Sequence, residues 1–183
     1  LKAQDGLGTD KVGANLTIEG GYATGAGRGG DLIFQTSQTT NTGAVANSYT
    51  TREYISAKWV NCVSNTATTF ITITNQTNTI IGAFLVPTVY CDNGTDYQAL
   101  TSTVMVNAVN KVNTITTTIT QVDSTTAASA GTLSVVYTVV SGAVANTIDI
   151  KATVQTSLTP TNLRVKWAAP VINSDGLATV TPL

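Results

Sequence analysis

Apolar and polar side chains alternate with a period of two along most of residues 54–170. Such alternation predicts half-buried β-strands, and no segment shows the 3.6-residue period of an amphipathic helix. Turn signals separate the short apolar runs, as in sandwiches and barrels. We therefore predict an all-β head, an antiparallel β-sandwich of the jelly-roll or Greek-key kind. The expected strands cover residues 55–63, 69–74, 79–91, 97–109, 114–122, 132–140, 147–155 and 162–168.

Three local signals refine this expectation. Gly82 and Pro87 interrupt residues 79–91, which favours a bulge, a bend or two shorter strands there. The sequence DNGTD at residues 92–96 contains Asn-Gly, a strong hairpin signal. Small residues at 123–131 predict a loop. The tail at 171–183 holds a Ser-Asp-Gly turn and is expected to add a strand or to run along a neighbouring subunit.

The N-terminal part has a different pattern, because nine of the fifteen glycines lie between Gly6 and Gly30. Two short apolar strands, at 15–18 and 31–35, emerge from this glycine-rich sequence. A segment this short rarely closes a core of its own, so it must pack on the head, stay mobile or associate with copies of itself. Association would bury an apolar set in a shared stem core: Leu16, Ile18, Leu32, Ile33 and Phe34. We predict a trimerising stem at 1–38, a linker at 39–53, the head at 54–170 and a tail at 171–183.

Composition narrows the class of protein. Charged residues make up 10% of the 183-residue chain and the net charge is −1, so the basic footprint of a nucleic-acid-binding protein is absent. No apolar run approaches the length of a membrane-spanning helix, and we expect no membrane insertion. Threonine, serine and asparagine carry the polar surface, which suits sheets exposed outside a cytoplasm. The chain begins at Leu1 without a signal peptide, and we expect a processed product or a piece of a longer protein.

The two cysteines, Cys62 and Cys91, lie in two predicted strands. A disulfide between them would close a loop of about 30 residues and stabilise the fold by roughly 3–4 kcal/mol. The alternative is a pair of separate buried thiols that pack as small apolar groups.

The glycine-rich segment resembles a stretch that recurs in bacteriophage tail fibres and other virion appendages. The matching residues are Gly8-Thr9, Gly13 to Ile18, Gly20-Gly21, Thr24-Gly25, Gly27, Gly29-Gly30 and Phe34 to Ser37. The charged residues Glu19, Arg28 and Asp31 depart from the pattern. More weakly, parts of residues 88–165 resemble fibre-head modules. The resemblance implies a trimeric virion fibre with an intertwined β stem, whose head binds host surface glycans or attaches a fibre to the particle.

Candidate chemistry is sparse. Histidine is absent, which removes the usual base of a nucleophilic triad and the commonest metal ligand. Of the acidic residues in the head, Asp92 and Asp96 are close in sequence; a hairpin tip is the favoured interpretation over a cation site or a carboxylate pair. Aromatic side chains stack on sugars, and the glycan candidates are Trp59, Tyr90, Tyr97 and Tyr137, with core packing favoured for the tryptophans.

We therefore expect no catalytic residue, no metal and no cofactor. The predicted ligand-binding residues are Tyr97, Asp92, Asp96 and Tyr90. The predicted function is multivalent attachment of a phage virion to host glycan, with a homotrimer, other virion proteins and host carbohydrate as partners. The alternatives are a capsid decoration or connector protein, a glycan hydrolase and a cellular adhesin.

Overall fold

The structure is a computed structural model that describes residues 18, 21, 24, 30–37, 49–55, 58–175 and 178–183. All regular secondary structure in these residues is β, so the predicted all-β class is confirmed. The strands are β1 (Leu32–Ser37), β2 (Tyr49–Ile55), β3 (Val60–Asn61), β4 (Ala67–Asn75), β5 (Thr79–Asp92), β6 (Tyr97–Lys111), β7 (Thr114–Ala128), β8 (Leu133–Ser141), β9 (Thr147–Thr156), β10 (Asn162–Ser174) and β11 (Ala178–Pro182).

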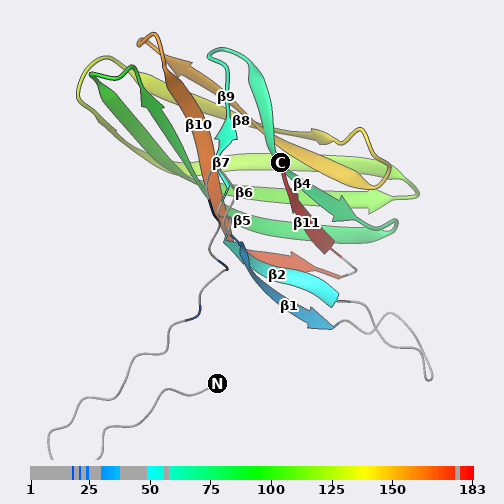
Figure 1. Cartoon of the computed structure of the whole chain (residues 1–183). Coiled ribbons are helices and arrows are strands. Elements are labelled where there is room, and N and C mark those ends of the chain that lie inside the picture. Colours follow the sequence, from blue (N-terminus) through cyan, green and yellow to red (C-terminus); the bar gives the residue numbers. More distant parts are fainter. Residues whose placement is uncertain are drawn as a thin grey trace, which may run out of the picture.

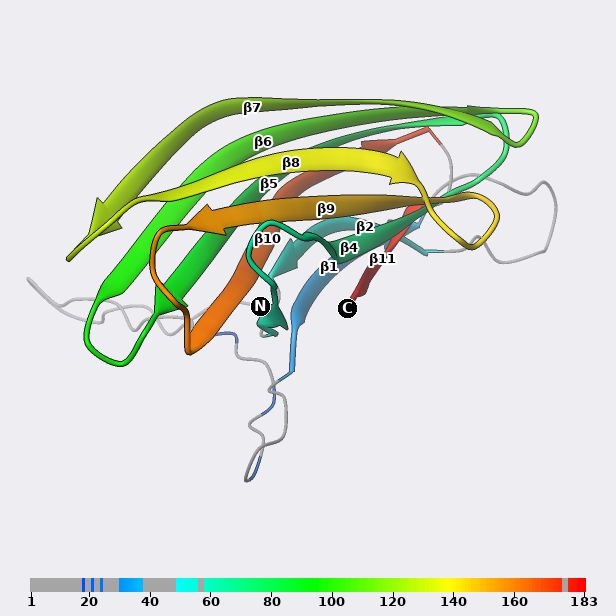
Figure 2. The same cartoon turned by 90° about the horizontal axis from the view of Figure 1, so that it is seen from above.

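Two antiparallel sheets form the sandwich (Figures 1 and 2). The larger sheet has the order β1-β2-β10-β5-β6-β7, with β3 also paired to β10, and the smaller has the order β11-β4-β9-β8. Strands β5, β6 and β7 follow each other as hairpins, and β10 returns to lie beside β5 after the chain has built β8 and β9 in the other sheet. The spatial order β10-β5-β6-β7 is that of a Greek key.

The core lies between the two sheets, and the period-two pattern determines which residues enter it. In β6 the even-numbered side chains from Gln98 to Asn110 are buried, whereas most odd-numbered ones face outward. The facing strands β4 and β9 supply Phe70, Ile71, Ile73, Ile148 and Ile150, all fully buried. Trp167 of β10 is buried as well, with its ring stacked on Tyr54 at a centroid distance of 5.0 Å.

The predicted boundary between stem and head does not coincide with the edge of the sheet. Residues 32–37 of the expected stem form β1, which pairs with β2, and β2 in turn pairs with β10 of the head. Residues 49–53 of the expected linker belong to β2. The larger sheet therefore begins at Leu32. Residues 38–48 lie outside the described residues, as does the predicted strand at 15–18 apart from Ile18.

Three predicted element boundaries are wrong. The strand expected at 55–63 is divided, because β2 ends at Ile55 and the two-residue β3 starts at Val60. The loop expected at 123–131 is largely strand, since β7 stays paired with β6 as far as Ala128. The strand expected to end at Ala168 continues to Ser174 as β10.

The irregularity expected in residues 79–91 lies in the neighbouring strand instead. Strand β5 is continuous and keeps one register with β6 from Thr79 to Asp92. The register shift occurs in β10 between Ala168 and Val171. Pro170 lies within this shift, as expected for a proline in a sheet, because a bulge releases its residue from the hydrogen-bonded ladder.

The two cysteines are free thiols. Leu163 of β10 separates them: it pairs with Cys91 of β5 on one side and accepts a hydrogen bond from the Cys62 backbone on the other. Two strand spacings amount to about 10 Å, and a disulfide requires Cα atoms within about 7 Å. The interpretation as separate thiols therefore holds.

Candidate functional site

One end of the larger sheet's outer face carries a cluster of aromatic and cationic side chains. Cross-strand pairing places one residue from each of five strands side by side there. From β3 to β7 the row is Asn61, Arg164, Tyr90, Ala99 and Ala127. Since neighbours in such a row point to the same face, Arg164 and Tyr90 stand side by side, and two alanines follow next to Tyr90.

Arg164 lies between two aromatic rings. Its guanidinium carbon is 4.9 Å from the centroid of the Trp59 ring and 5.1 Å from that of Tyr90. The two rings are themselves 6.1 Å apart and tilted by 57°. Lys166 adds a second cation 5.8 Å from the Trp59 ring. Cation–π attraction of this kind fixes both rings at the surface.

Tyr90 and Tyr97 line one shallow hollow of about 320 Å³. Ala99 and Ala127 line it as well, so the small side chains between two rings create the depression. Tyr97 is 52% exposed. Its backbone N–H donates to the Ser129 hydroxyl over 2.9 Å, which anchors the strand end that carries the ring. We refer to Trp59, Tyr90, Tyr97 and Arg164 as the aromatic platform.

The DNGTD segment forms the predicted hairpin between β5 and β6. Asn93 accepts backbone hydrogen bonds from Thr95 at 3.0 Å and Asp96 at 2.7 Å, and Gly94 has a positive φ of 88°. Both features are typical of turn chemistry. The segment therefore serves to position Tyr97 at the edge of the hollow.

The two carboxylates of the hairpin have partners inside the protein. Asp92 is buried, and both of its oxygens accept from the Asn162 side-chain amide, at 3.0 and 3.3 Å. Asp96 accepts from the Ser129 hydroxyl at 3.1 Å. Asp92 thus stabilises the base of the hairpin, whereas Asp96 lies beside Tyr97.

The other sequence candidates are distributed between core and surface. Tyr137 is buried, with its hydroxyl 3.3 Å from Ser102, and Trp167 is in the core, as expected for one tryptophan. Trp59 is partly exposed rather than buried, because Arg164 and Lys166 hold it against the outer face. The sequence alone does not link Arg164 to the tyrosines, because only the register of β10 against β5 brings Arg164 beside Tyr90.

The residues proposed for the stem core have different positions. Leu16 lies outside the described residues. Ile18, Ile33 and Phe34 are exposed in the single chain, and Leu32 is half-buried. Exposed apolar side chains on an edge strand leave the association of copies open, and it stays a prediction.

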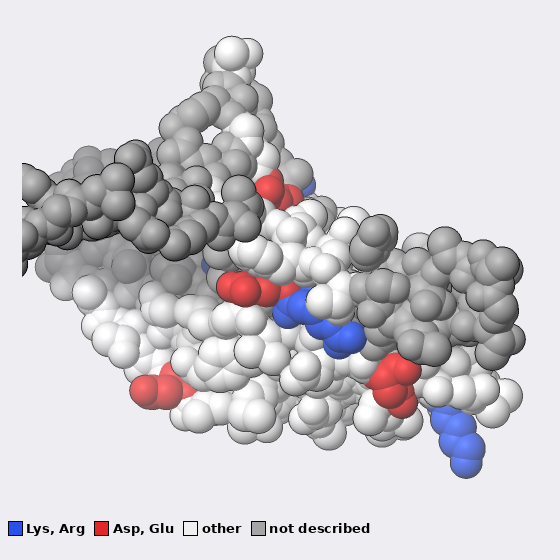
Figure 3. Space-filling view, turned by 90° about the horizontal axis from the view of Figure 1, so that it is seen from below, with Lys and Arg blue, Asp and Glu red and all other residues white. Residues whose placement is uncertain are grey.

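Groups for catalysis are few in the part of the chain that the structure describes. There, no three His, Cys, Asp or Glu side chains gather in a way that could hold a metal ion. Burial raises the pKa of the Cys62 thiol, which keeps it protonated and weakly nucleophilic at neutral pH. Figure 3 shows that the described residues of this face are mostly uncharged, with acidic and basic side chains adjoining near its centre.

No helix among the described residues is long and apolar enough to cross a membrane.

The comparisons with known proteins give one similar structure. No protein-family model and no curated protein matches the sequence. Among solved structures, the chain is similar to the tailspike protein of Acinetobacter baumannii phage AM24, with a TM-score of 0.35 and 9% sequence identity. The similar region covers 82% of this chain and 28% of the tailspike chain. A similarity at this level carries no argument about function, which we infer from the residues themselves.

Proposed function

We propose that the protein is a non-enzymatic fibre protein of a phage virion, and that its head attaches the particle to glycan on the host surface. The aromatic platform is the observation that carries this proposal. Sugar rings have apolar C–H faces and polar edges, so they suit an exposed aromatic ring beside hydrogen-bonding groups. Tyr97 offers an exposed ring, and the alanine-lined hollow gives access to the ring of Tyr90.

The surroundings of the platform support a carbohydrate over other ligands. The chain has ten percent charged residues and a net charge of −1, which does not suit a nucleic acid or an anionic membrane surface. The hollow is open and shallow, and its polar groups are hydroxyls and amides. Such a surface gives weak single-site binding, which a fibre compensates by carrying several copies.

Substitution Tyr97→Ala tests the platform. We expect glycan binding to weaken about fivefold or more, because removing one central aromatic anchor typically costs more than about 1 kcal/mol. Glycan-array binding followed by calorimetry on the best glycan measures the effect. The matched control is Tyr97→Phe, which keeps the ring and removes the hydroxyl.

Binding that is equal in Tyr97→Ala and the parent chain would remove the platform from the proposal. An array without any bound glycan would instead favour a decoration or connector protein of the virion. Release of reducing sugars from host polysaccharide would support a hydrolase.

We propose further that three chains assemble through the glycine-rich segment. The reason is that residues 1–30 are too few to build a core alone, and glycine permits close approach of backbones. Light scattering on the full chain is expected to give three times the monomer mass of 18.9 kDa. A chain shortened to start at Gly30 is expected to be monomeric. A monomeric full chain would contradict trimerisation.

A further inference from the structure

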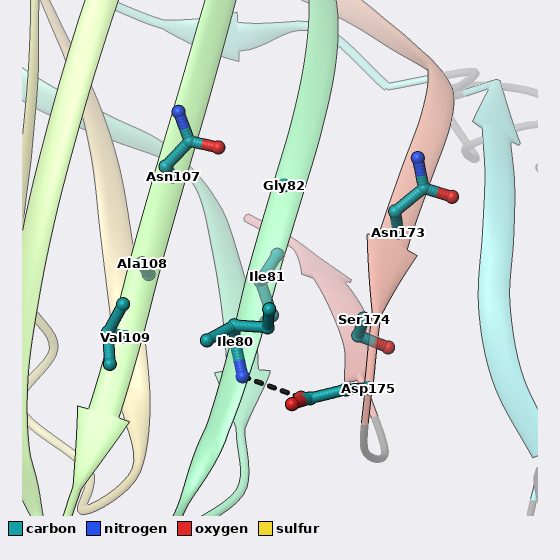
Figure 4. Close-up of a pocket in the computed structure, with 9 residues that line it drawn as sticks. All are labelled: Ile80, Ile81, Gly82, Asn107, Ala108, Val109, Asn173, Ser174 and Asp175. Carbon is teal, nitrogen blue, oxygen red and sulfur yellow. Dashed lines mark hydrogen bonds between the residues drawn. The ribbon is translucent and has the colours of Figure 1, made fainter.

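A second feature of the larger sheet's outer face lies at Gly82, in the middle of β5. Cross-strand pairing puts Asn107 of β6 directly on one side of it and Asn173 of β10 on the other. Figure 4 shows the two amides on either side of Gly82. Two strand spacings separate the asparagine backbones by about 10 Å. The missing side chain between them leaves an open slot.

The backbone does not require glycine at this position. Gly82 has no positive φ, and a Cβ placed there would meet one atom, the Asn107 side-chain oxygen at 3.3 Å. Glycine inside a strand weakens the sheet and often marks a place where a ligand approaches closely. Because glycine has no side chain, the slot between the two asparagines reaches down to the β5 backbone.

Apolar side chains form the two walls of the slot. Phe84, Met105 and Val171 line a hollow of about 480 Å³ on one side. Ile80 and Val109 line a hollow of about 520 Å³ on the other. Both hollows include Gly82, Asn107 and Asn173, so they join at the slot.

The polar groups of the slot point to an uncharged ligand. Neither the Asn107 nor the Asn173 amide has a hydrogen-bond partner among the described residues, so their donors and acceptors are available. Asp175 supplies the one charged side chain among the lining residues, and the Ile80 backbone N–H donates to its carboxylate over 2.6 Å. Strands β5, β6 and β10 are flanked by other strands here, except on the side of β10 facing β2. Their backbone N–H and C=O groups are used in pairing with those strands. A ligand on this face therefore binds through side chains.

Separate hollows follow one another along β5 from the slot to the aromatic platform. The outward side chains Val86 and Thr88 line a further depression of about 290 Å³ together with Lys166, whose ammonium lies over the Trp59 ring, and Tyr90 follows at the platform. Gly82 and Tyr90 are eight residues apart on the same face of one continuous strand, which corresponds to about 27 Å. An elongated molecule along β5 would contact each hollow in turn.

We infer that the outer face of β5 binds a neutral polysaccharide chain lengthwise, from the platform to the slot at Gly82. The amides of Asn107 and Asn173 hydrogen-bond sugar hydroxyls, and the apolar walls contact the C–H faces. This inference rests on the proposed function in taking glycan as the ligand class, and adds a neutral, extended chain and a second contact region.

The substitution Gly82→Val fills the slot. Valine favours strands, so the variant is expected to fold, as thermal unfolding would confirm. Asn107→Ala removes one amide and leaves the slot open. The matched control is Ser134→Val, which adds a similar side chain to the exposed face of β8 in the other sheet. The probes are maltooligosaccharides and chitooligosaccharides from disaccharide to octasaccharide, with the best neutral glycan from an array.

For the parent chain we expect affinity to rise with probe length and to level off once the chain spans about 27 Å. Gly82→Val is expected to abolish that rise, at least a tenfold loss for the longest probe, while short probes bind as before. We expect Asn107→Ala to bind the longest probe several-fold more weakly than the parent chain. Ser134→Val is expected to bind it with unchanged affinity.

The outcomes separate the two proposals. Length-independent binding that Tyr97→Ala removes and Gly82→Val leaves intact overturns the lengthwise track and retains the platform. Binding lost in Gly82→Val and unchanged in Tyr97→Ala removes the platform and retains the slot. Binding of charged glycans alone, or of none, overturns the neutral chain. A change of oligomeric mass in Gly82→Val, measured by light scattering, shows a contact between copies and overturns the saccharide slot.

Discussion

Replacing Phe70 by alanine is expected to lower the free energy of unfolding by about 3–5 kcal/mol. Phe70 is fully buried between the sheets, and its ring meets Tyr137 edge-on at a centroid distance of 6.1 Å. Removing it loses this contact and leaves a cavity between the sheets that the surrounding core closes only in part. Natural domains have a total stability of about 5–15 kcal/mol, so the loss is a large part of it.

Urea unfolding followed by circular dichroism measures this change. The matched control is Val136→Ala in β8, the neighbour of Tyr137, because its side chain is 62% exposed. We expect the control to stay within about 0.5 kcal/mol of the parent chain. A loss below about 1 kcal/mol in Phe70→Ala would contradict the position of this ring in the core.

Raising the pH is expected to destabilise the protein through Tyr137. Burial raises the pKa of the Tyr137 hydroxyl to about 12, and its hydrogen bond with the Ser102 hydroxyl acts in the opposite direction. In the unfolded chain the pKa is about 10. Below about pH 10 the hydroxyl is protonated in both states, and its contribution is constant. Between the two pKa values the unfolded state releases the proton and the folded state retains it, so stability falls as pH rises.

A difference of about two pKa units corresponds to about 2.7 kcal/mol, taken as an order of magnitude. The measurement is urea unfolding of the parent chain and of Tyr137→Phe at a series of pH values from about 8 to 12. The difference between the two proteins isolates the contribution of Tyr137. We expect Tyr137→Phe to lose less stability at high pH than the parent chain. Parallel curves would contradict the buried, protonated hydroxyl.

The local pattern of apolar and polar residues was sufficient to predict several strands and one turn of the head. Alternation in β6, β8 and β9 predicted their positions to within a few residues, since one face of each is buried against the other sheet. The turn at 92–96 was predictable because Asn93 and Gly94 act within the turn itself. These features depend on residues close in sequence.

Other features depend on partners far along the chain. Residues 123–128 have the small side chains of a loop, and they are strand because β6 offers a free row of backbone hydrogen bonds. Residues 32–37 join the head's sheet because β2 pairs with them and with β10. Phe70 and Ile71 are both buried, which departs from the alternation of the strand, and they lie at the register shift against β9 between Thr69 and Ile71.

The candidate sites also combine features set by residues close in sequence with features set by residues far apart in sequence. The sequence by itself determined the all-β class, the sparse charge, the absence of histidine and the hairpin. Tertiary structure decided that Arg164 lies between Trp59 and Tyr90, that Asp92 is held by Asn162, and that Gly82 lies between two amides. The physical reason is that strand registers are set by packing over the whole sandwich, and registers determine which side chains of distant segments stand side by side.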